Sequence, residues 1–162
     1  MEENENDEVL RLQMMETLKD LGEGKTVGAL AGFTPDDLEA VYSLGYASYQ
    51  AGKFDEAEKI FRFVCLFDHL EKKYFFALGG ALQAQRKFAE AIPVYASVML
   101  RDLDDMQAYL RLAECQLALG ERGEAVSALE LAMGRPEPAD GENRGYRAEA
   151  QKTLARLKGG AK

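Results

Sequence analysis

One pattern recurs along the chain with a period of 34 residues, and it restricts the fold more than any other feature. Residues 38–71, 72–105 and 106–139 align at this period without a gap. Each copy places a leucine before a small residue and, later, an alanine four residues before a large apolar residue. A fixed period of this length is typical of repeated helix pairs. The recurring positions are Leu44, Gly45, Ala57 and Phe61, then Leu78, Gly79, Ala91 and Tyr95, then Leu112, Ala113, Ala125 and Leu129.

The pattern resembles the tetratricopeptide repeat, a pair of antiparallel helices that stacks into a solenoid. Two helices approach closely only where neither presents a bulky side chain, so we expect the small residue of each copy at a helix crossing. Gly52 and Gly120 supply turns with positive φ between paired helices, and Arg86 holds that place in the middle copy, where strain is expected. The usual tryptophan is replaced in the three copies, by Val41, Phe75 and Tyr109.

Helices are also predicted on both sides of the repeats. Apolar residues spaced four, four and three apart predict an N-terminal helix over residues 8–21. Thr34 is a candidate cap for the first repeat helix, with Pro35 at its first position. Pro93 is expected to bend its helix rather than to end it. The N-terminal apolar face consists of Leu10, Met14, Leu18 and Leu21.

After the third repeat, prolines and glycines over residues 134–145 indicate a mobile linker, and residues 146–157 read as a helix that closes the stack. We therefore predict an all-α fold: a helical solenoid of three tandem tetratricopeptide repeats with an N-terminal helix and a C-terminal capping helix. Its regions are an N-terminal helix and connector over 1–35, the repeats over 36–133, and a linker with the final helix over 134–162.

Composition limits the partners. The chain has 20 Lys and Arg against 28 Asp and Glu, a net charge of −8, which argues against nucleic acid or an anionic membrane as the main ligand. No apolar run reaches the roughly 18–20 residues of a membrane span, and the acidic start is unlike a secretory signal. A cytosolic protein with a basic or apolar protein partner is expected.

Candidate catalytic and ligand-binding residues are sparse. The segment "GEGKT" lacks the earlier glycine and the preceding strand of a phosphate-binding loop, so no nucleotide is expected. Cys65 and His69 share one helix, but two more ligands are missing for structural zinc, and no third group orients them for catalysis. Cys115 is expected to be a buried, reduced thiol. We predict a protein that is not an enzyme and holds no metal or cofactor.

Three tyrosines distinguish the first repeat. In a tetratricopeptide stack the first helix of each pair lines the concave side, and Tyr42, Tyr46 and Tyr49 fall on groove positions. The packing positions of the same helix are assigned to Val41, Leu44 and Gly45, so the tyrosines are expected to be free for a ligand. The alternative is that they pack against the N-terminal helix. Corresponding groove positions in the other repeats include Lys73, Phe76, Gly80, Gln83, Gln107, Leu110 and Glu114.

Over residues 24–133 the chain also resembles the class II chaperones of bacterial type III secretion, which hold pore-forming translocators before export. The resemblance rests on "LEAVYSLGYASYQAGKFDEAEKIFRFVCLFDHLEKKYFFALGGALQAQRKFAEAIPVY", on "AYLRLAECQLALGERGEAVSALELA" and on the preceding "GKTVGALAGFTPDDLEAVY". It implies a chaperone of the bacterial cytoplasm whose concave groove binds an extended segment of hydrophobic translocators. It also implies a homodimer formed through the N-terminal helix and first repeat.

The family's groove aromatics fall on Tyr42, Tyr46 and Tyr49, and its histidine at the end of the second helix falls on His69. Phe76, Gln83, Leu110 and Glu114 match only as groove positions, and Leu10, Met14 and Leu18 are the candidates for the dimer interface. The main alternative is a generic tetratricopeptide adaptor for another protein's acidic carboxyl terminus. Such a clamp needs Lys and Asn where this chain has tyrosines.

Overall fold

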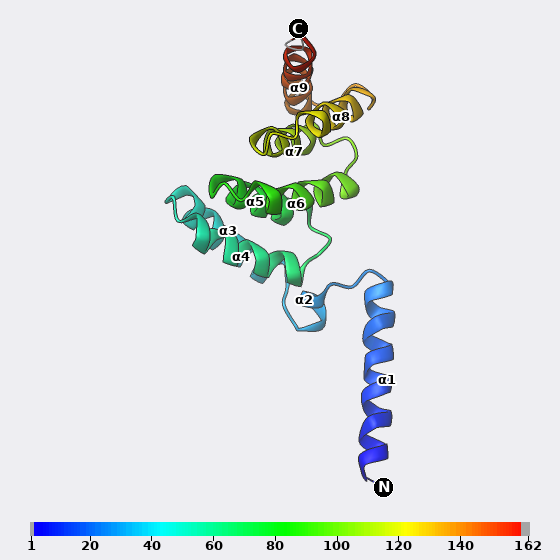
Figure 1. Cartoon of the computed structure of the whole chain (residues 1–162). Coiled ribbons are helices and arrows are strands. Elements are labelled where there is room, and N and C mark those ends of the chain that lie inside the picture. Colours follow the sequence, from blue (N-terminus) through cyan, green and yellow to red (C-terminus); the bar gives the residue numbers. More distant parts are fainter. Residues whose placement is uncertain (1, 160–162) are drawn as a thin grey trace.

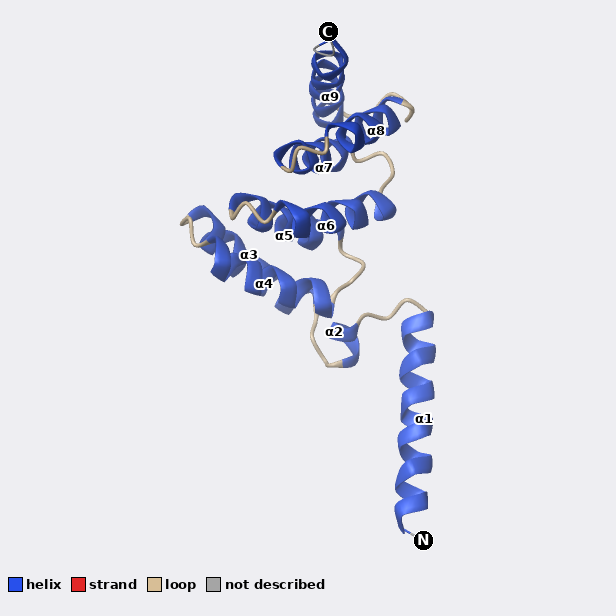
Figure 2. Cartoon of the chain, viewed as in Figure 1, coloured by secondary structure: helices blue, strands red, loops and turns tan. Residues whose placement is uncertain are grey.

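The computed structural model describes residues 2–159, with side chains from residue 8 onward, and the regular elements in this range are all helices (Figure 2). Consecutive helices pair in antiparallel fashion and the pairs stack on one another (Figure 1). The predicted all-α solenoid of three tetratricopeptide-like pairs is therefore confirmed. The pairs are α3 (Pro35–Gln50) with α4 (Phe54–Phe67), α5 (Lys72–Ala84) with α6 (Phe88–Arg101), and α7 (Met106–Ala118) with α8 (Arg122–Met133).

The two ends of the stack differ. At the C-terminal end, α9 (Gly141–Gly159) packs on α7 and α8 and covers the last pair. At the other end, α2 (Val27–Leu30) contacts α4, whereas α1 (Glu2–Gly22) extends away from the repeats (Figure 1). Most apolar residues of α1 are consequently exposed, namely Val9, Leu10, Leu12, Met14, Met15 and Leu18.

The predicted close crossings are present. A Cβ atom added to Gly45 would lie 2.7 Å from Cε1 of Phe61, and one added to Gly79 would lie 2.6 Å from Cε1 of Tyr95. No side chain fits at these distances, so the first and second pairs each need a glycine at the crossing. Ala113 serves the third pair and is fully buried.

One packing assignment is wrong. Leu78 and Leu112 are buried, as the repeat pattern predicts, but the equivalent Leu44 is 60% exposed. The later leucines belong to pairs that follow another pair, whereas α3 begins the stack and α1 does not cover it. A repeat pattern identifies the packing face of a helix, but not whether that face has a neighbour.

The turns between paired helices use left-handed backbone. Gly52 and Gly120 have φ of 76° and 80°, and Arg86 has φ of 61°, which confirms the strained position predicted for it. In the first turn the N–H of Lys53 donates to the carbonyl of Ser48 at 2.9 Å, the six-to-one bond of a Schellman motif.

The helix start predicted from capping residues is correct, whereas the linker predicted from glycines is partly helical. Thr34 and Asp37 form a reciprocal capping box at the start of α3, and α6 continues through Pro93, both as predicted. The final helix, however, begins at Gly141, inside the predicted linker. Asp140 accepts a hydrogen bond from the N–H of Asn143 at 2.7 Å, so a capped helix start outweighs the poor helix propensity of the glycines.

A buried carboxylate joins the first two pairs. Glu58 of α4 accepts hydrogen bonds from Lys87 at 2.7 Å, from Gln85 at 2.8 Å and from Arg62 at 2.8 Å. Burial alone would raise the pKa of Glu58, but these bonds outweigh it and lower the pKa from 4.5 to about 2. The carboxylate is therefore charged at neutral pH and fixes α4 against the turn between α5 and α6.

Candidate functional site

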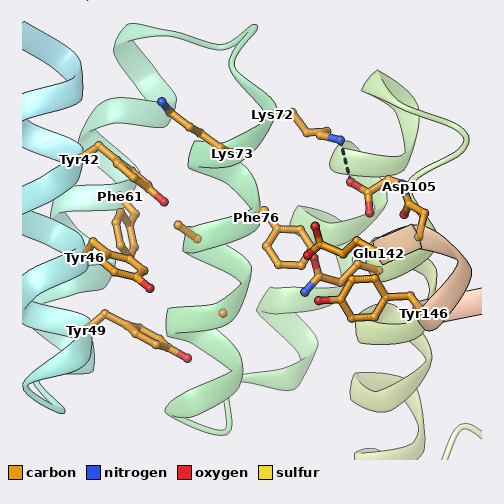
Figure 3. Close-up of a pocket in the computed structure, with 14 residues that line it drawn as sticks. Tyr42, Tyr46, Tyr49, Phe61, Lys72, Lys73, Phe76, Asp105, Glu142 and Tyr146 are labelled. Carbon is orange, nitrogen blue, oxygen red and sulfur yellow. Dashed lines mark hydrogen bonds and ion pairs between the residues drawn. The ribbon is translucent and has the colours of Figure 1, made fainter. Parts of the chain in front are cut away.

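A cavity of about 440 Å³ lies on the face formed by the first helices of the pairs, α3, α5 and α7, and reaches the start of α9 (Figure 3). The helices α6 and α8 contribute no residue to it. Its walls are largely aromatic, with charged side chains at one side. The lining residues are Tyr42, Tyr46, Tyr49, Phe61, Lys72, Lys73, Phe76, Ala77, Gly80, Asp105, Gln107, Glu142, Asn143 and Tyr146.

Tyrosines of α3 form one wall. Tyr42, Tyr46 and Tyr49 follow one another at helical spacing, and their hydroxyl groups point into the cavity (Figure 3). Tyr46 is 49% exposed, and its ring stacks on Tyr42 at a centroid distance of 6.3 Å. Within the described part of the chain, none of the three hydroxyls forms a hydrogen bond with another residue. The wall therefore offers apolar ring surface together with unpaired donors and acceptors.

Two of these tyrosines also belong to the core, which corrects the expectation that all three are free of packing. The ring of Tyr42 lies 5.6 Å from Phe61 and 5.3 Å from Tyr74, between ring centroids. Tyr49 contacts Phe54 edge to face at 5.2 Å. Because α1 does not cover α3, these contacts come from within the repeats and not from the N-terminal helix. Of the three, Tyr46 is the most exposed, and its aromatic contact is with Tyr42.

Helix α5 forms the floor. Phe76 packs edge to face on the buried Tyr95 at 5.5 Å, which fixes its ring in the cavity (Figure 3). Ala77 and Gly80 line the floor beyond it with little side-chain volume. The floor therefore has one raised aromatic edge and a lower stretch facing the tyrosines.

The two lysines at the cavity are paired with carboxylates. Lys72 donates to Asp102 at 2.7 Å and to Asp105 at 2.8 Å, joining the second and third pairs. Lys73 pairs with Glu39 and lies 5.4 Å from the ring centroid of Tyr42, a cation–π distance. Both lysines that line the cavity thus have carboxylate partners, so little positive charge remains for an acidic ligand.

The start of α9 forms the wall opposite the tyrosines, through Glu142, Asn143 and Tyr146 (Figure 3). Asn143 Oδ1 accepts a hydrogen bond from the N–H of Met106 at 3.1 Å and so caps α7. Sequence analysis missed this wall because the glycines around residue 141 suggested a linker. Asp140 followed three residues later by Asn143 was the available signal for a helix start.

Several predicted groove residues lie outside the cavity. The predicted residues that do line it are Tyr42, Tyr46, Tyr49, Lys73 and Phe76, and their role in binding stays a prediction. Leu110 does not line it, because α9 packs on α7 and makes this concave position part of the core, where Leu110 is 2% exposed.

Three further predicted residues are engaged elsewhere. Gln83 donates to Glu114 at 3.0 Å and accepts from Tyr95 at 2.9 Å, outside the cavity lining. His69 lies in the turn after α4, where its carbonyl accepts hydrogen bonds from Arg101. The candidate dimer residues Leu10, Met14 and Leu18 are all exposed on α1.

Other candidate chemistry finds no support in the described residues. Burial raises the pKa of the Cys65 thiol to about 12 and that of Cys115 to about 11, so both are protonated at neutral pH. Among the side chains that the structure describes, from residue 8 to residue 159, no cluster of His, Cys, Asp and Glu could hold a metal ion. Over the same range, no helix combines the length and apolarity of a membrane span.

Comparison with known proteins connects this architecture to a family. Tetratricopeptide-repeat family models match residues 28–62 and 82–140. The low calcium response locus protein H of Yersinia pestis is 36% identical over 110 residues, which are 68% of this chain and 66%, just under two thirds, of that protein.

Solved structures match over a larger share of the chain. A type III secretion complex from Aeromonas hydrophila matches with a TM-score of 0.82 and 35% identity, over 89% of this chain and 95% of that one. The Yersinia enterocolitica translocator chaperone SycD matches with a TM-score of 0.74 and 32% identity, over 82% of this chain and 98% of its own.

SycD has also been solved with a peptide of the translocator YopD and as an alternative dimer. Both structures match with a TM-score of 0.70 and 32% identity over 77% of this chain, and cover 95% and 94% of their own chains. The repeats, the aromatic concave cavity and these matches together show that the chain belongs to the family of type III secretion translocator chaperones.

Proposed function

We propose that the chain binds hydrophobic translocators of a type III secretion system in the bacterial cytoplasm and holds them until export. An extended translocator segment occupies the cavity between α3, α5 and α9. The observation that carries this proposal is the wall of three tyrosines whose hydroxyls have no partner in the described chain. A family member solved with a translocator peptide supports the choice of ligand.

The wall suits an extended peptide for a physical reason. A peptide that leaves water must pair its backbone groups or lose free energy, and tyrosine hydroxyls both donate and accept. Tyrosine rings also bury apolar side chains at low entropic cost, since each has few rotors. Such a surface accepts segments of varied sequence while it shields their apolar residues from aggregation.

The protein acts as a stoichiometric holder and not as an enzyme in this proposal. Both thiols are buried and protonated, and Asp105 of the cavity lining is engaged by Lys72. The paired lysines also disfavour the alternative of a clamp for an acidic carboxyl terminus, because such a clamp must offer cations to the carboxylate.

Tyr46→Ala tests the proposal with the smallest effect on the fold, because Tyr46 is exposed while Tyr42 and Tyr49 pack on the core. We expect binding of a translocator segment, followed by fluorescence anisotropy, to weaken about tenfold, as for an interface hot spot, with the melting temperature unchanged. Leu131→Ala is the matched control, since Leu131 is 63% exposed on α8, away from the cavity. Unchanged affinity for Tyr46→Ala, or competition by an acidic C-terminal peptide, would reject the proposed site.

We also propose that α1 mediates self-association. Its leucines and methionines are exposed, whereas a helix isolated in water would gain by covering them. In light scattering, Leu10→Asp combined with Leu18→Asp is expected to convert dimers to monomers without changing the helical content of the repeats. A wild-type chain that is monomeric at all concentrations would refute this role for α1.

A further inference from the structure

One charged group of the cavity has no partner. Four charged side chains line the cavity, and three of them are paired, Lys72 with Asp105 and Lys73 with Glu39. The carboxylate of Glu142 forms neither an ion pair nor a hydrogen bond with any residue that the structure describes. The α9 side of the cavity therefore carries a negative charge that the chain itself does not balance.

The start of α9 does not depend on this carboxylate. Negative charge near a helix N-terminus is favourable, and Glu142 lies in the first turn of α9. Asp140, however, already serves the helix start, because its side chain accepts from the N–H of Asn143 at 2.7 Å and from Nδ2 of Asn143 at 3.0 Å. Asp140 does not line the cavity, whereas Glu142 does. Capping of α9 thus accounts for Asp140 and leaves the placement of Glu142 in the cavity unexplained.

Aromatic rings and neutral polar groups surround Glu142. It lies beside Phe76 and Tyr146 (Figure 3), and Gln107 belongs to the same lining. Within the described part of the chain, the side chains of Gln107 and Tyr146 form no hydrogen bond with another residue. A long cationic side chain suits these surroundings, because its methylene groups can pack on the rings while its charged end meets the carboxylate and the neutral acceptors.

We propose that Glu142 determines specificity: together with Phe76, Gln107 and Tyr146 it binds one Lys or Arg side chain of the translocator segment. This inference rests on the proposed function and adds a charge requirement at one position of the segment. An acidic residue at that position is disfavoured by repulsion, and an apolar residue leaves the carboxylate without a partner. The tyrosine wall on α3 offers no such charge, so the cation also fixes which part of the segment lies at α9.

Exchanging charges between protein and peptide tests this pairing. An array of overlapping peptides from the translocators encoded by the same genome first identifies a segment that wild type binds. That segment is resynthesised with Lys, Gln or Glu at each position in turn, and fluorescence anisotropy gives the Kd for wild type, Glu142→Gln and Glu142→Lys. Glu149→Lys is the matched control, because Glu149 is exposed on the same helix and does not line the cavity.

Wild type is expected to prefer Lys over Glu at one position of the segment by about tenfold, since attraction and repulsion between partly exposed charges are each worth about threefold. Glu142→Gln should remove most of this preference, and Glu142→Lys should reverse it. Glu149→Lys should keep the wild-type preference. Added salt should reduce the preference of wild type, because ions screen the two charges from each other.

The outcomes separate this inference from the function beneath it. If Glu142 only stabilises α9, Glu142→Lys will weaken all peptides of the set equally and lower the melting temperature. That result, or a wild type that prefers Lys at no position, rejects the specificity role of Glu142 while the chaperone function stands. If wild type captures no segment of any translocator, both proposals fail.

Discussion

At the scale of single residues, the chain uses its repeat positions for packing and departs from the repeat at the candidate site. Gly45 and Gly79 recur because Phe61 and Tyr95 leave no room for a side chain. The tyrosines of α3 do not recur, and Tyr46 is exposed beside Tyr42. The sequence was sufficient to find both groups. It could not show that Tyr42 also packs on Tyr74 of the next pair, since that contact depends on how two repeats stack.

Arg86 permits a prediction at this scale. Its φ of 61° places a residue with a Cβ in the left-handed region that Gly52 and Gly120 occupy in the other turns. Arg86→Gly should therefore stabilise the fold by about 0.5–1 kcal/mol, the left-handed strain less the extra entropy of glycine in the unfolded chain. Urea unfolding should show a higher midpoint with an unchanged slope.

Gly120→Ala provides the reverse substitution at the equivalent turn, where φ is 80°, and it should lower the midpoint. If Arg86→Gly were neutral or destabilising while Gly120→Ala behaved as expected, the left-handed strain at Arg86 would be relieved by contacts that are absent from the other turns.

At the scale of elements, α9 both ends the stack and completes the cavity. Arg147 donates to three carbonyls at the end of α8, those of Ala132, Met133 and Arg135, at 2.9–3.0 Å. These bonds hold the helix whose second turn carries Tyr146 into the cavity. Apolar spacing predicted the later part of α9, but its start was hidden by glycines, and its contact with the cavity follows only from the three-dimensional stack.

We predict that loosening α9 weakens ligand binding without touching the cavity. Arg147→Ala removes the hydrogen bonds to α8, so amide hydrogen exchange over residues 141–159 should accelerate. Affinity for a translocator segment should fall about three- to tenfold, because a smaller fraction of molecules has the wall in place.

Arg144→Ala is the control, since among the described residues the Arg144 side chain donates only to the carbonyls of Ala139 and Asp140, in its own segment. It should leave both the exchange rates and the affinity unchanged. Faster exchange in Arg147→Ala with full affinity would show that α9 closes the stack but is not part of the binding site.

At the scale of the whole molecule, the chain is a repeat stack with one covered end and one open end. The fold class was predictable because a period of 34 residues leaves few alternatives to stacked helix pairs. The position of α1 was not predictable, because an apolar helical face indicates that a partner exists but does not identify it. Leu44 makes the same point, because its exposure depends on the absence of a preceding pair.

The central claim is that the ligand lies in the tyrosine-lined cavity, and site-specific photo-crosslinking measures this directly. A benzophenone amino acid is placed at Tyr46 or at Leu131 in the full chain, which is then co-expressed with a translocator and irradiated. We predict crosslinks from position 46 to one short extended segment of the translocator and none from position 131 on α8. Efficient crosslinking from position 131 with none from position 46 would contradict the account.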